Sequence, residues 1–341
     1  MIEAFQGNRP VVEALERMID AGRITQTILL DGPEGVGKAT LARRFAARLM
    51  GETGKIEQDD LSLERNTTLI EEREKWPAEK RVDDPLLFSS HPDFVTFPPD
   101  GPLRQISIQQ MRLLKELAQY KPLKGAWRVF LIDHVDRAGE QAANSLLKTL
   151  EEPPDHLILV MTAENPYDLL PTIRSRAVSF HMGRLQDEEM RSFAAARGLD
   201  QVERRLALAA GSPGAALALD LEDYDRRRAA MLALLAAACG EAEFGAWVKH
   251  AESIAARKSE KLELYLKVLY LLLGDILTLK YGGGELRNPD IRPALEALTV
   301  RAEFEWVRKA VAKVDELMNL LRRNIQKSIA LDALVVDLRS M

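Results

Sequence analysis

The chain is poor in the features that mark secreted and membrane proteins. Cys239 is the single cysteine, which excludes an intrachain disulfide and favours a reducing compartment. The first residues, Met1–Phe5, lack the basic stretch followed by an apolar core that marks a secretory signal. The longest apolar stretch, residues 262–279, is interrupted by Lys267 and Asp275 and therefore indicates a buried helix of a soluble domain. We expect a cytoplasmic protein without a membrane partner.

Aromatic residues and basic charge are also scarce. Aromatics make up 6% of a chain that is 46% hydrophobic, a balance that favours helices packed on helices over a β-sandwich. The 47 Lys and Arg are outnumbered by 52 Asp and Glu, which gives a net charge of −5. An independent nucleic-acid-binding protein is disfavoured, because such proteins carry a basic surface. At 341 residues, the chain is long enough for roughly two or three domains.

What the chain does contain is a phosphate-binding loop that lacks one part. Residues 31–40 read Asp-Gly-Pro-Glu-Gly-Val-Gly-Lys-Ala-Thr. Glycines that let backbone N–H groups face a phosphate, and a lysine that adds positive charge, are all present: Gly32, Gly35, Gly37 and Lys38. The motif requires Ser or Thr next to hold Mg²⁺, but Ala39 stands there. Thr40 is turned by about 100° along the helix, so it points away from the metal, although it could still touch an α-phosphate.

A second nucleotide motif is altered as well. Residues 129–133 form an apolar run that ends in Asp133, the position at which such strands hold the metal ion through water. In active hydrolases a Glu follows this Asp and orients the attacking water. His134 occupies that position here, and it reads equally well as an ordinary residue at the end of a strand. Because Ala39 and His134 both replace parts needed for hydrolysis, the sequence indicates lost catalysis.

The order of apolar segments predicts an α/β fold. Short apolar runs at 27–30, 94–97, 129–132 and 157–161 are typical of a parallel sheet covered on both faces, and helical segments separate them. Residues 51–90 interrupt this pattern with 11 acidic against 6 basic residues and few apolar ones. We expect this segment to be an exposed, partly helical insertion.

Beyond residue 176 the pattern becomes helical. Near the C-terminus, apolar residues repeat at alternating steps of three and four: Phe304, Val307, Val311, Val314, Met318, Leu321 and Ile325. Such a seam is typical of the core of a helical bundle, and a surface between subunits is the sharper alternative.

Two further segments carry a family resemblance. Residues 142–154, Ala-Ala-Asn-Ser-Leu-Leu-Lys-Thr-Leu-Glu-Glu-Pro-Pro, and residues 169–176, Leu-Leu-Pro-Thr-Ile-Arg-Ser-Arg, resemble the bacterial DNA polymerase III clamp-loader subunits, an AAA+ ATPase family. Delta-prime subunits fit best. With the pattern above, the resemblance predicts an AAA+ P-loop α/β domain at 1–182, a small helical lid at 183–222 and an all-α, collar-like bundle at 223–341.

The resemblance implies roles for individual residues. Three of them match the family's nucleotide-binding positions: Lys38, Asp133 and Thr162. Ser175 and Arg176 match the motif that reaches across to a neighbouring subunit's ATP. Relatives carry, at the position of Ala215, an Arg that touches their own γ-phosphate. The resemblance therefore implies a subunit that completes another's active site, whereas Arg176 without this context reads as a surface ion pair.

The resemblance also implies partners and excludes a metal. Relatives carry a four-cysteine zinc module before the segment that starts at His91, and residues 51–90 contain no cysteine, so we expect no zinc. Weak ATP or ADP binding stays compatible with the surviving glycines and lysine, and no other cofactor is indicated. The implied partners are the loader's ATPase subunits and clamp-opening subunit and, through the complex, the sliding clamp and primed DNA.

The rival hypothesis is a working AAA+ P-loop ATPase, either the motor subunit of the loader or an unrelated enzyme. It requires Thr40 or water to hold Mg²⁺, and another group in place of the missing Glu. ATP hydrolysis by the purified chain separates the two hypotheses.

Overall fold

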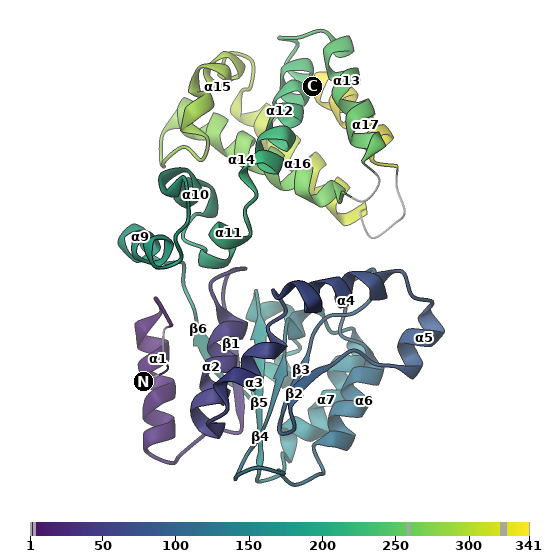
Figure 1. The fold of residues 1–341 in the computed structure, drawn as a ribbon. Helices are drawn as coiled ribbons and strands as arrows, with labels where there is room; N and C mark the ends of the chain where they lie inside the picture. Colours follow the sequence, from purple (N-terminus) through teal and green to yellow (C-terminus); the bar gives the residue numbers. More distant parts are fainter. Residues whose placement is uncertain (1, 3–4, 258–259, 321–325, 341) are drawn as a thin grey trace. The chain divides into compact units, whose positions relative to one another are not determined.

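The computed structural model describes residues 2, 5–257, 260–320 and 326–340 (Figure 1). The chain divides into two compact units, residues 1–198 with 211–215, and residues 199–210 with 216–341. The first unit is built around a β-sheet, and the described part of the second is helical. The domain boundaries expected near residues 182 and 222 stay predictions.

A six-stranded sheet forms the centre of the first unit, with the strand order β2-β3-β4-β5-β1-β6. The strands are β1 (Thr27–Asp31), β2 (Phe88–His91), β3 (Phe94–Phe97), β4 (Arg128–Ile132), β5 (Leu157–Ala163) and β6 (Val178–His181). Neighbours pair in parallel except β2 and β3, which are antiparallel. Strand β1 lies between β5 and β6, so the connections diverge beside its carboxyl end, where open α/β sheets bind ligands.

The expected α/β class is confirmed, and the four apolar runs predicted as strands correspond to β1, β3, β4 and β5. Strands β2 and β6 were not expected. Both lie at edges of the sheet and carry exposed residues, including Ser89, Ser90 and Val178, so neither forms a continuous apolar run. Buried strands are recognisable from sequence because both of their faces are covered, whereas these edge strands are not.

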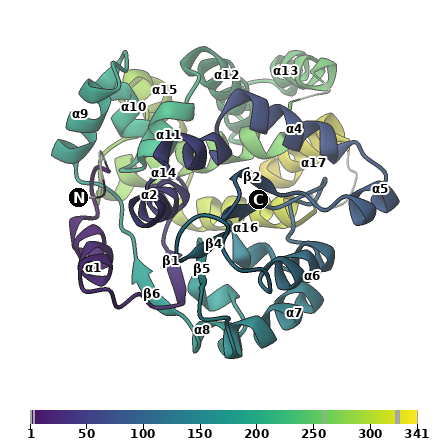
Figure 2. The same cartoon turned by 60° about the horizontal axis from the view of Figure 1, so that its bottom comes forward.

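Helices cover both faces of the sheet (Figure 2). One face packs on α1 (Arg9–Asp20) and α2 (Lys38–Met50), and the other packs on α6 (Ile108–Leu117), α7 (Glu140–Glu151) and α8 (Pro171–Arg174). Alternating side chains of β1 serve the two layers: Ile28 and Leu30 join the first core, and Leu29 joins the second. Short 3₁₀ turns η2 (Val135–Arg137) and η3 (Pro166–Asp168) follow β4 and β5, and α9 (Asp187–Ala196) follows β6.

Residues 51–90 form a partly helical segment in which most residues are exposed, but a few charged side chains are buried. They contain α3 (Thr53–Ile56), η1 (Glu57–Asp59), α4 (Glu64–Glu74) and α5 (Ala78–Asp83), and they end in β2. Polar groups account for much of the burial, because Arg73 is 2% exposed and pairs with Asp84 and Asp100, while Asp59 accepts a hydrogen bond from the Ser90 N–H. The expectation of an exposed, partly helical insertion is therefore confirmed for most of these residues, and the buried charged side chains are what the sequence did not indicate.

Helices make up the described part of the second unit: α10 (Val202–Ala209), α12 (Leu221–Ala238), α13 (Phe244–Ala256), α14 (Leu262–Tyr281), α15 (Arg292–Thr299), α16 (Phe304–Leu320) and α17 (Lys327–Arg339), with the turn η4 (Pro289–Ile291). Helix α11 (Pro213–Ala218) begins in the first unit and ends in the second. A single apolar core joins α12 to α17 and includes the fully buried Trp247, Leu269 and Leu331.

The predicted C-terminal seam lies on α16. Val307 and Val314 are completely buried in the bundle, Val311 and Met318 pack against the same core, and Phe304 is 56% exposed. Leu321 and Ile325 lie outside the described residues. The described part of the seam thus serves mainly as core. No helix among the described residues is long and apolar enough to cross a membrane.

Candidate functional site

The phosphate-binding loop joins β1 to α2 at the carboxyl edge of the sheet. Gly37 caps α2, and Lys38 is the first residue of that helix. Gly32 has φ 141° and Gly35 has φ 77°, conformations that side chains with a Cβ rarely adopt. A Cβ at Gly32 would lie 2.1 Å from the Met182 carbonyl oxygen. The glycines are therefore required by this backbone, whatever ligand the loop holds.

Lys38 is directed at its own loop. Its Nζ donates hydrogen bonds to the carbonyl oxygens of Gly32, at 2.6 Å, and Pro33, at 2.8 Å, and the residue is 6% exposed. Burial lowers the pKa of Lys38, while nearby carboxylates, first among them Glu164 and then Asp133, act in the opposite direction. Two of the three N–H donors of this ammonium are therefore used by its own loop.

The turn at residues 211–215 contacts the same loop. The Ser212 Oγ donates to the Glu34 carbonyl at 3.0 Å, and the Gly214 N–H donates to the Gly35 carbonyl at 2.8 Å. A Cβ at Gly35 would lie 2.3 Å from the Ser212 Oγ, so this close approach depends on glycine. Ala215, where relatives are expected to carry an Arg, brings no positive charge to the turn.

The residues after Lys38 do not restore the missing hydroxyl. Ala39 packs against the apolar core between α2 and the sheet. The Thr40 Oγ1 accepts a hydrogen bond of 3.4 Å from Arg43, which is 2% exposed and also pairs with Glu57 and Asp60. The Thr40 hydroxyl therefore has a partner on its own helix, consistent with the direction expected from the helical turn.

Asp133 and Thr162 meet at the ends of β4 and β5. The Thr162 Oγ1 donates to Asp133 Oδ1 at 2.6 Å and accepts from the His134 N–H at 2.8 Å. Both side chains are almost completely buried, and His134 has φ 54°. The structure thus brings Asp133 and Thr162 into direct contact beside the phosphate loop, Thr162 on β5, which pairs with β1, and Asp133 at the end of β4, the next strand.

Two carboxylates in this region were not among the residues predicted from sequence motifs. The Glu164 Oε1 lies 3.5 Å from His134 Nδ1 and 3.2 Å from Arg137 Nη2, and the Asp136 Oδ2 accepts a hydrogen bond from the Glu164 N–H. The one feature of the sequence that could have indicated Asp136 and Glu164 is their position shortly after β4 and β5. Among the described residues, no cluster of three or more His, Cys, Asp or Glu side chains is arranged to hold a metal ion. The absence of zinc stays a prediction.

Ser175 and Arg176 lie at the opposite edge of the sheet. Arg176 comes two residues before β6, and β6 pairs in parallel with β1 from Ile28↔Val178 to Asp31↔His181. The Arg176 Nη2 donates to Glu151 Oε1 at 2.7 Å, and Nη1 donates to the Thr172 carbonyl at 2.9 Å. The structure therefore brings together Lys38, Asp133 and Thr162, but not Arg176.

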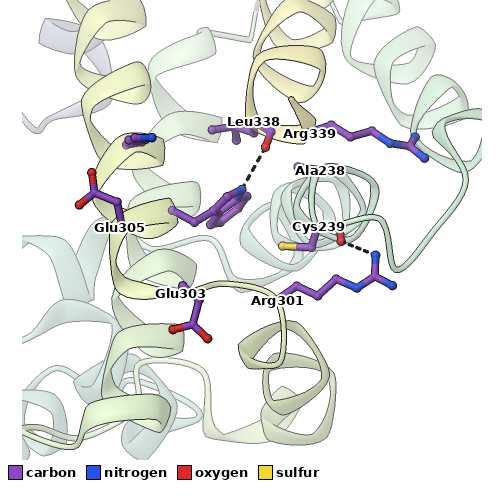
Figure 3. Close-up of a pocket in the computed structure, with 9 residues that line it drawn as sticks. Ala238, Cys239, Arg301, Glu303, Glu305, Leu338 and Arg339 are labelled. Carbon is purple, nitrogen blue, oxygen red and sulfur yellow. Dashed lines mark hydrogen bonds between the residues drawn. The ribbon is translucent and has the colours of Figure 1, made fainter. Parts of the chain in front are cut away.

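A pocket in the second unit has a different character (Figure 3). It measures about 350 Å³ and is lined by Cys239, Arg301, Trp306 and Arg339, among others. Arg301 Nη1 donates to the carbonyls of Cys239 and Gly240, and Trp306 Nε1 donates to the Leu338 carbonyl, so these side chains cap helix ends. Burial raises the pKa of the Cys239 thiol to about 11.

Sequence comparisons match about half of the chain. The chain is 32% identical to DNA polymerase III subunit tau of Escherichia coli over 185 residues, which cover 54% of this chain and 26% of that protein. It is 31% identical to DNA polymerase III subunit gamma/tau of Mycobacterium tuberculosis over 189 residues, or 55% of this chain and 30% of that protein. The chain thus spans less than a third of the length of these two relatives.

A solved structure and a family model complete the comparison. A DNA polymerase III gamma subunit-related protein of Thermotoga maritima aligns with a TM-score of 0.48 at 18% identity, over 96% of this chain and 98% of that one. The family model described as DNA polymerase III, delta subunit, matches residues 7–186, more than half of the chain. The chain therefore belongs to the DNA polymerase III, delta subunit, family, and the AAA+ clamp-loader relationship predicted from residues 142–154 and 169–176 is confirmed.

Proposed function

We propose that this chain is a delta-prime-like subunit of a DNA polymerase III clamp loader that hydrolyses no ATP itself. In this proposal it assembles with the loader's ATPase subunits and clamp-opening subunit, and Arg176 acts on the ATP of a neighbouring subunit. The sliding clamp and primed DNA are partners of the whole complex. The helical bundle at 223–341 is its assembly domain, since it carries an extensive apolar core without a motif for chemistry.

One observation carries the proposal: the ammonium of Lys38 is bonded to the carbonyl oxygens of Gly32 and Pro33. In a working phosphate loop this lysine serves the β- and γ-phosphates. Ala39 and His134 occupy the positions of the Mg²⁺ hydroxyl and the water-orienting carboxylate, so the two other parts needed for hydrolysis are also replaced. The presence of Lys38 without this hydroxyl and this carboxylate is better explained by a structural role in the loop than by ATP hydrolysis.

Arg176 has the properties that action on a neighbour requires. Its side chain is 34% exposed, and its sequence setting matches the family's motif. A guanidinium stabilises charge on the transferring γ-phosphoryl oxygens. At the amino edge of the sheet, Arg176 lies across the strands from its own phosphate loop, which favours action in trans over action in cis.

ATP turnover tests the proposal. The purified chain should hydrolyse ATP far more slowly than typical enzymes, which turn over at about 1 s⁻¹ or faster. Mixed with its cognate ATPase subunits, it should raise their turnover in the presence of sliding clamp and primed DNA. Turnover near that rate by the chain alone, abolished in Lys38→Ala, would refute the proposal.

The second candidate is a working P-loop ATPase, such as the loader's motor subunit, and it is supported by tau and gamma/tau subunits being among the proteins that match, at 31 to 32% identity. The buried hydrogen bond between Thr162 and Asp133 also retains the arrangement that a nucleotide site uses. In this candidate the third N–H donor of Lys38 serves a phosphate, or Lys38 leaves its two carbonyl partners when ATP binds. The same turnover measurement decides between the candidates.

A further inference from the structure

Part of the Arg176 guanidinium is hydrogen-bonded within this chain, and part of it has no hydrogen-bond partner among the described residues. Nη2 donates to Glu151 Oε1 at 2.7 Å, and Nη1 donates to the Thr172 carbonyl at 2.9 Å and approaches the Ser175 Oγ at 3.5 Å. A guanidinium has five N–H donors. Nε–H and one hydrogen of Nη2 therefore have no hydrogen-bond partner among the described residues.

The position of Glu151 is unfavourable for its own helix. It is the last residue of α7, where the unpaired carbonyls of a helix end create a partial negative charge, and Glu152 follows directly. A carboxylate at this position is repelled by the helix end, whereas Lys or Arg would be stabilised there. Glu151 is also 48% exposed, so it adds little to the apolar packing. The ion pair with Arg176 is therefore the interaction that explains a carboxylate at this position.

We propose, resting on the function proposed above, that Glu151 is a positioning residue for Arg176. Glu151 and the Thr172 carbonyl fix the Nη end of the guanidinium and leave the Nε edge for two oxygens of a triphosphate on the neighbouring subunit. Arginine loses much rotamer freedom when it binds, and holding the side chain beforehand removes part of that loss. The fork geometry of the open edge matches two phosphate oxygens.

The opposite role for the same contact gives a different result. If the carboxylate restrained Arg176 by competing with phosphate, removing its charge would release the guanidinium and raise the neighbour's ATP turnover. If it positions Arg176, a neutral side chain with an oxygen in the same place should still serve. Glu151→Gln keeps that oxygen and loses the charge, and Glu151→Ala loses both, so this pair separates the two roles.

The experiment measures kcat and KM for ATP in the complex with cognate ATPase subunits, sliding clamp and primed DNA. We expect Glu151→Ala to lower the part of kcat that depends on Arg176 by about threefold to fivefold, with little change in KM, as fits the loss of one partly exposed pair. Glu151→Gln should stay near wild type. Glu151→Asp, whose side chain is one methylene shorter, should lower kcat as Glu151→Ala does. It replaces Glu151→Ala in the experiment if the alanine variant assembles poorly. Size-exclusion chromatography checks assembly.

Two controls make the outcomes distinct. Glu152→Ala removes a neighbouring carboxylate that makes no recorded contact with Arg176, and it should leave kcat unchanged. In an Arg176→Ala background, Glu151→Ala should have no further effect. If Arg176→Ala itself changes nothing, the proposed function fails. If Arg176→Ala lowers turnover but Glu151→Ala does not, or if both Glu151→Ala and Glu151→Gln raise it, the positioning role is overturned and the proposed function stands.

Discussion

The phosphate loop and the turn that carries Arg176 are both short, polar segments next to the sheet, but their charged groups lie in opposite environments. Lys38 is 6% exposed and bonded to two carbonyls of its own loop, whereas a third of the Arg176 side chain is exposed and one edge of its guanidinium has no partner among the described residues. A buried ammonium bonded to two carbonyls of its own loop stabilises the fold that surrounds it, while an exposed guanidinium with open donors can bind another molecule.

The strand topology explains why the two segments differ. The loop follows the carboxyl end of β1, and Arg176 precedes the amino end of β6, which runs parallel to β1. A strand of five residues spans about 16 Å. The sheet therefore separates the two charges, so each can change without the other. A change in the phosphate loop can therefore leave the geometry around Arg176 intact.

The largest expected effect comes from Arg176. At its interface, Arg176→Ala should lower ATP hydrolysis by the neighbouring subunit on the order of 10³-fold, since arginine fingers contribute 10³ to 10⁵. The fall in total turnover is smaller, because a loader with several ATP sites loses only this share. Single-turnover hydrolysis in complexes with equal assembly measures it. Arg176→Lys should rescue poorly, because an ammonium lacks the planar fork.

Arg174 provides a matched control for that variant. It lies in the same turn and stacks over the Tyr167 ring at 4.9 Å. Arg174→Ala removes an equal charge from this region but leaves the contacts of Arg176 in place, so turnover should stay near wild type. Equal losses from the two variants would mean that the general positive charge of the turn matters, and Arg176 would have no special role.

Lys38 should show the opposite behaviour. In a working ATPase, Lys38→Ala would abolish turnover and spare the fold. Here we expect it to lower the free energy of unfolding by about 1 to 3 kcal/mol, because two carbonyl groups of a buried loop lose their donor. Turnover of the complex should change little. Calorimetric unfolding of the isolated chain gives the stability, and the complex gives the turnover.

Lys38→Met is the matched variant, since it keeps an unbranched apolar chain and removes the ammonium. A loss of stability similar to that of Lys38→Ala would assign the effect to the hydrogen bonds and not to a cavity. A stable Lys38→Ala protein whose complex no longer hydrolyses ATP would break the comparison between the two segments and favour the working ATPase.

The strands that a run of apolar residues predicts are those with both faces buried. The runs at 129–132 and 157–161 predicted β4 and β5 well, because nothing but apolar residues fits there. The order within residues 51–90 could not be predicted in the same way, because burial of Arg73 and Asp59 depends on ion pairs and backbone hydrogen bonds with residues up to 31 positions away. The pattern of apolar residues along the sequence does not predict such ion pairs and hydrogen bonds.

The candidate site was predictable in its parts but not in its contacts. The positions of Lys38, Asp133 and Thr162 followed from motifs and strand ends. The bonds from Lys38 back to Gly32 and Pro33 could not be foreseen, since the same sequence also allows the lysine to face a phosphate. The contact between Ser212 and Glu34 joins residues 178 positions apart, and no local pattern encodes it.

That contact offers the smallest of the expected effects and a direct test of the loop's structural role. Ser212 is 2% exposed, its Oγ donates to the Glu34 carbonyl at 3.0 Å, and it accepts from the Ala215 N–H at 3.3 Å. Ser212→Ala should lower the free energy of unfolding by about 1 kcal/mol and leave the effect of Arg176 on the neighbour unchanged. Ser253→Ala, on the exposed face of α13, is the control and should be neutral or slightly stabilising, because alanine favours helix. If Ser212→Ala changed the free energy of unfolding as little as Ser253→Ala does, the hydrogen bonds of Ser212 to the loop would not stabilise the fold. If it altered the neighbour's ATP turnover, the two edges of the sheet would be coupled, and the independence inferred from the topology would be wrong.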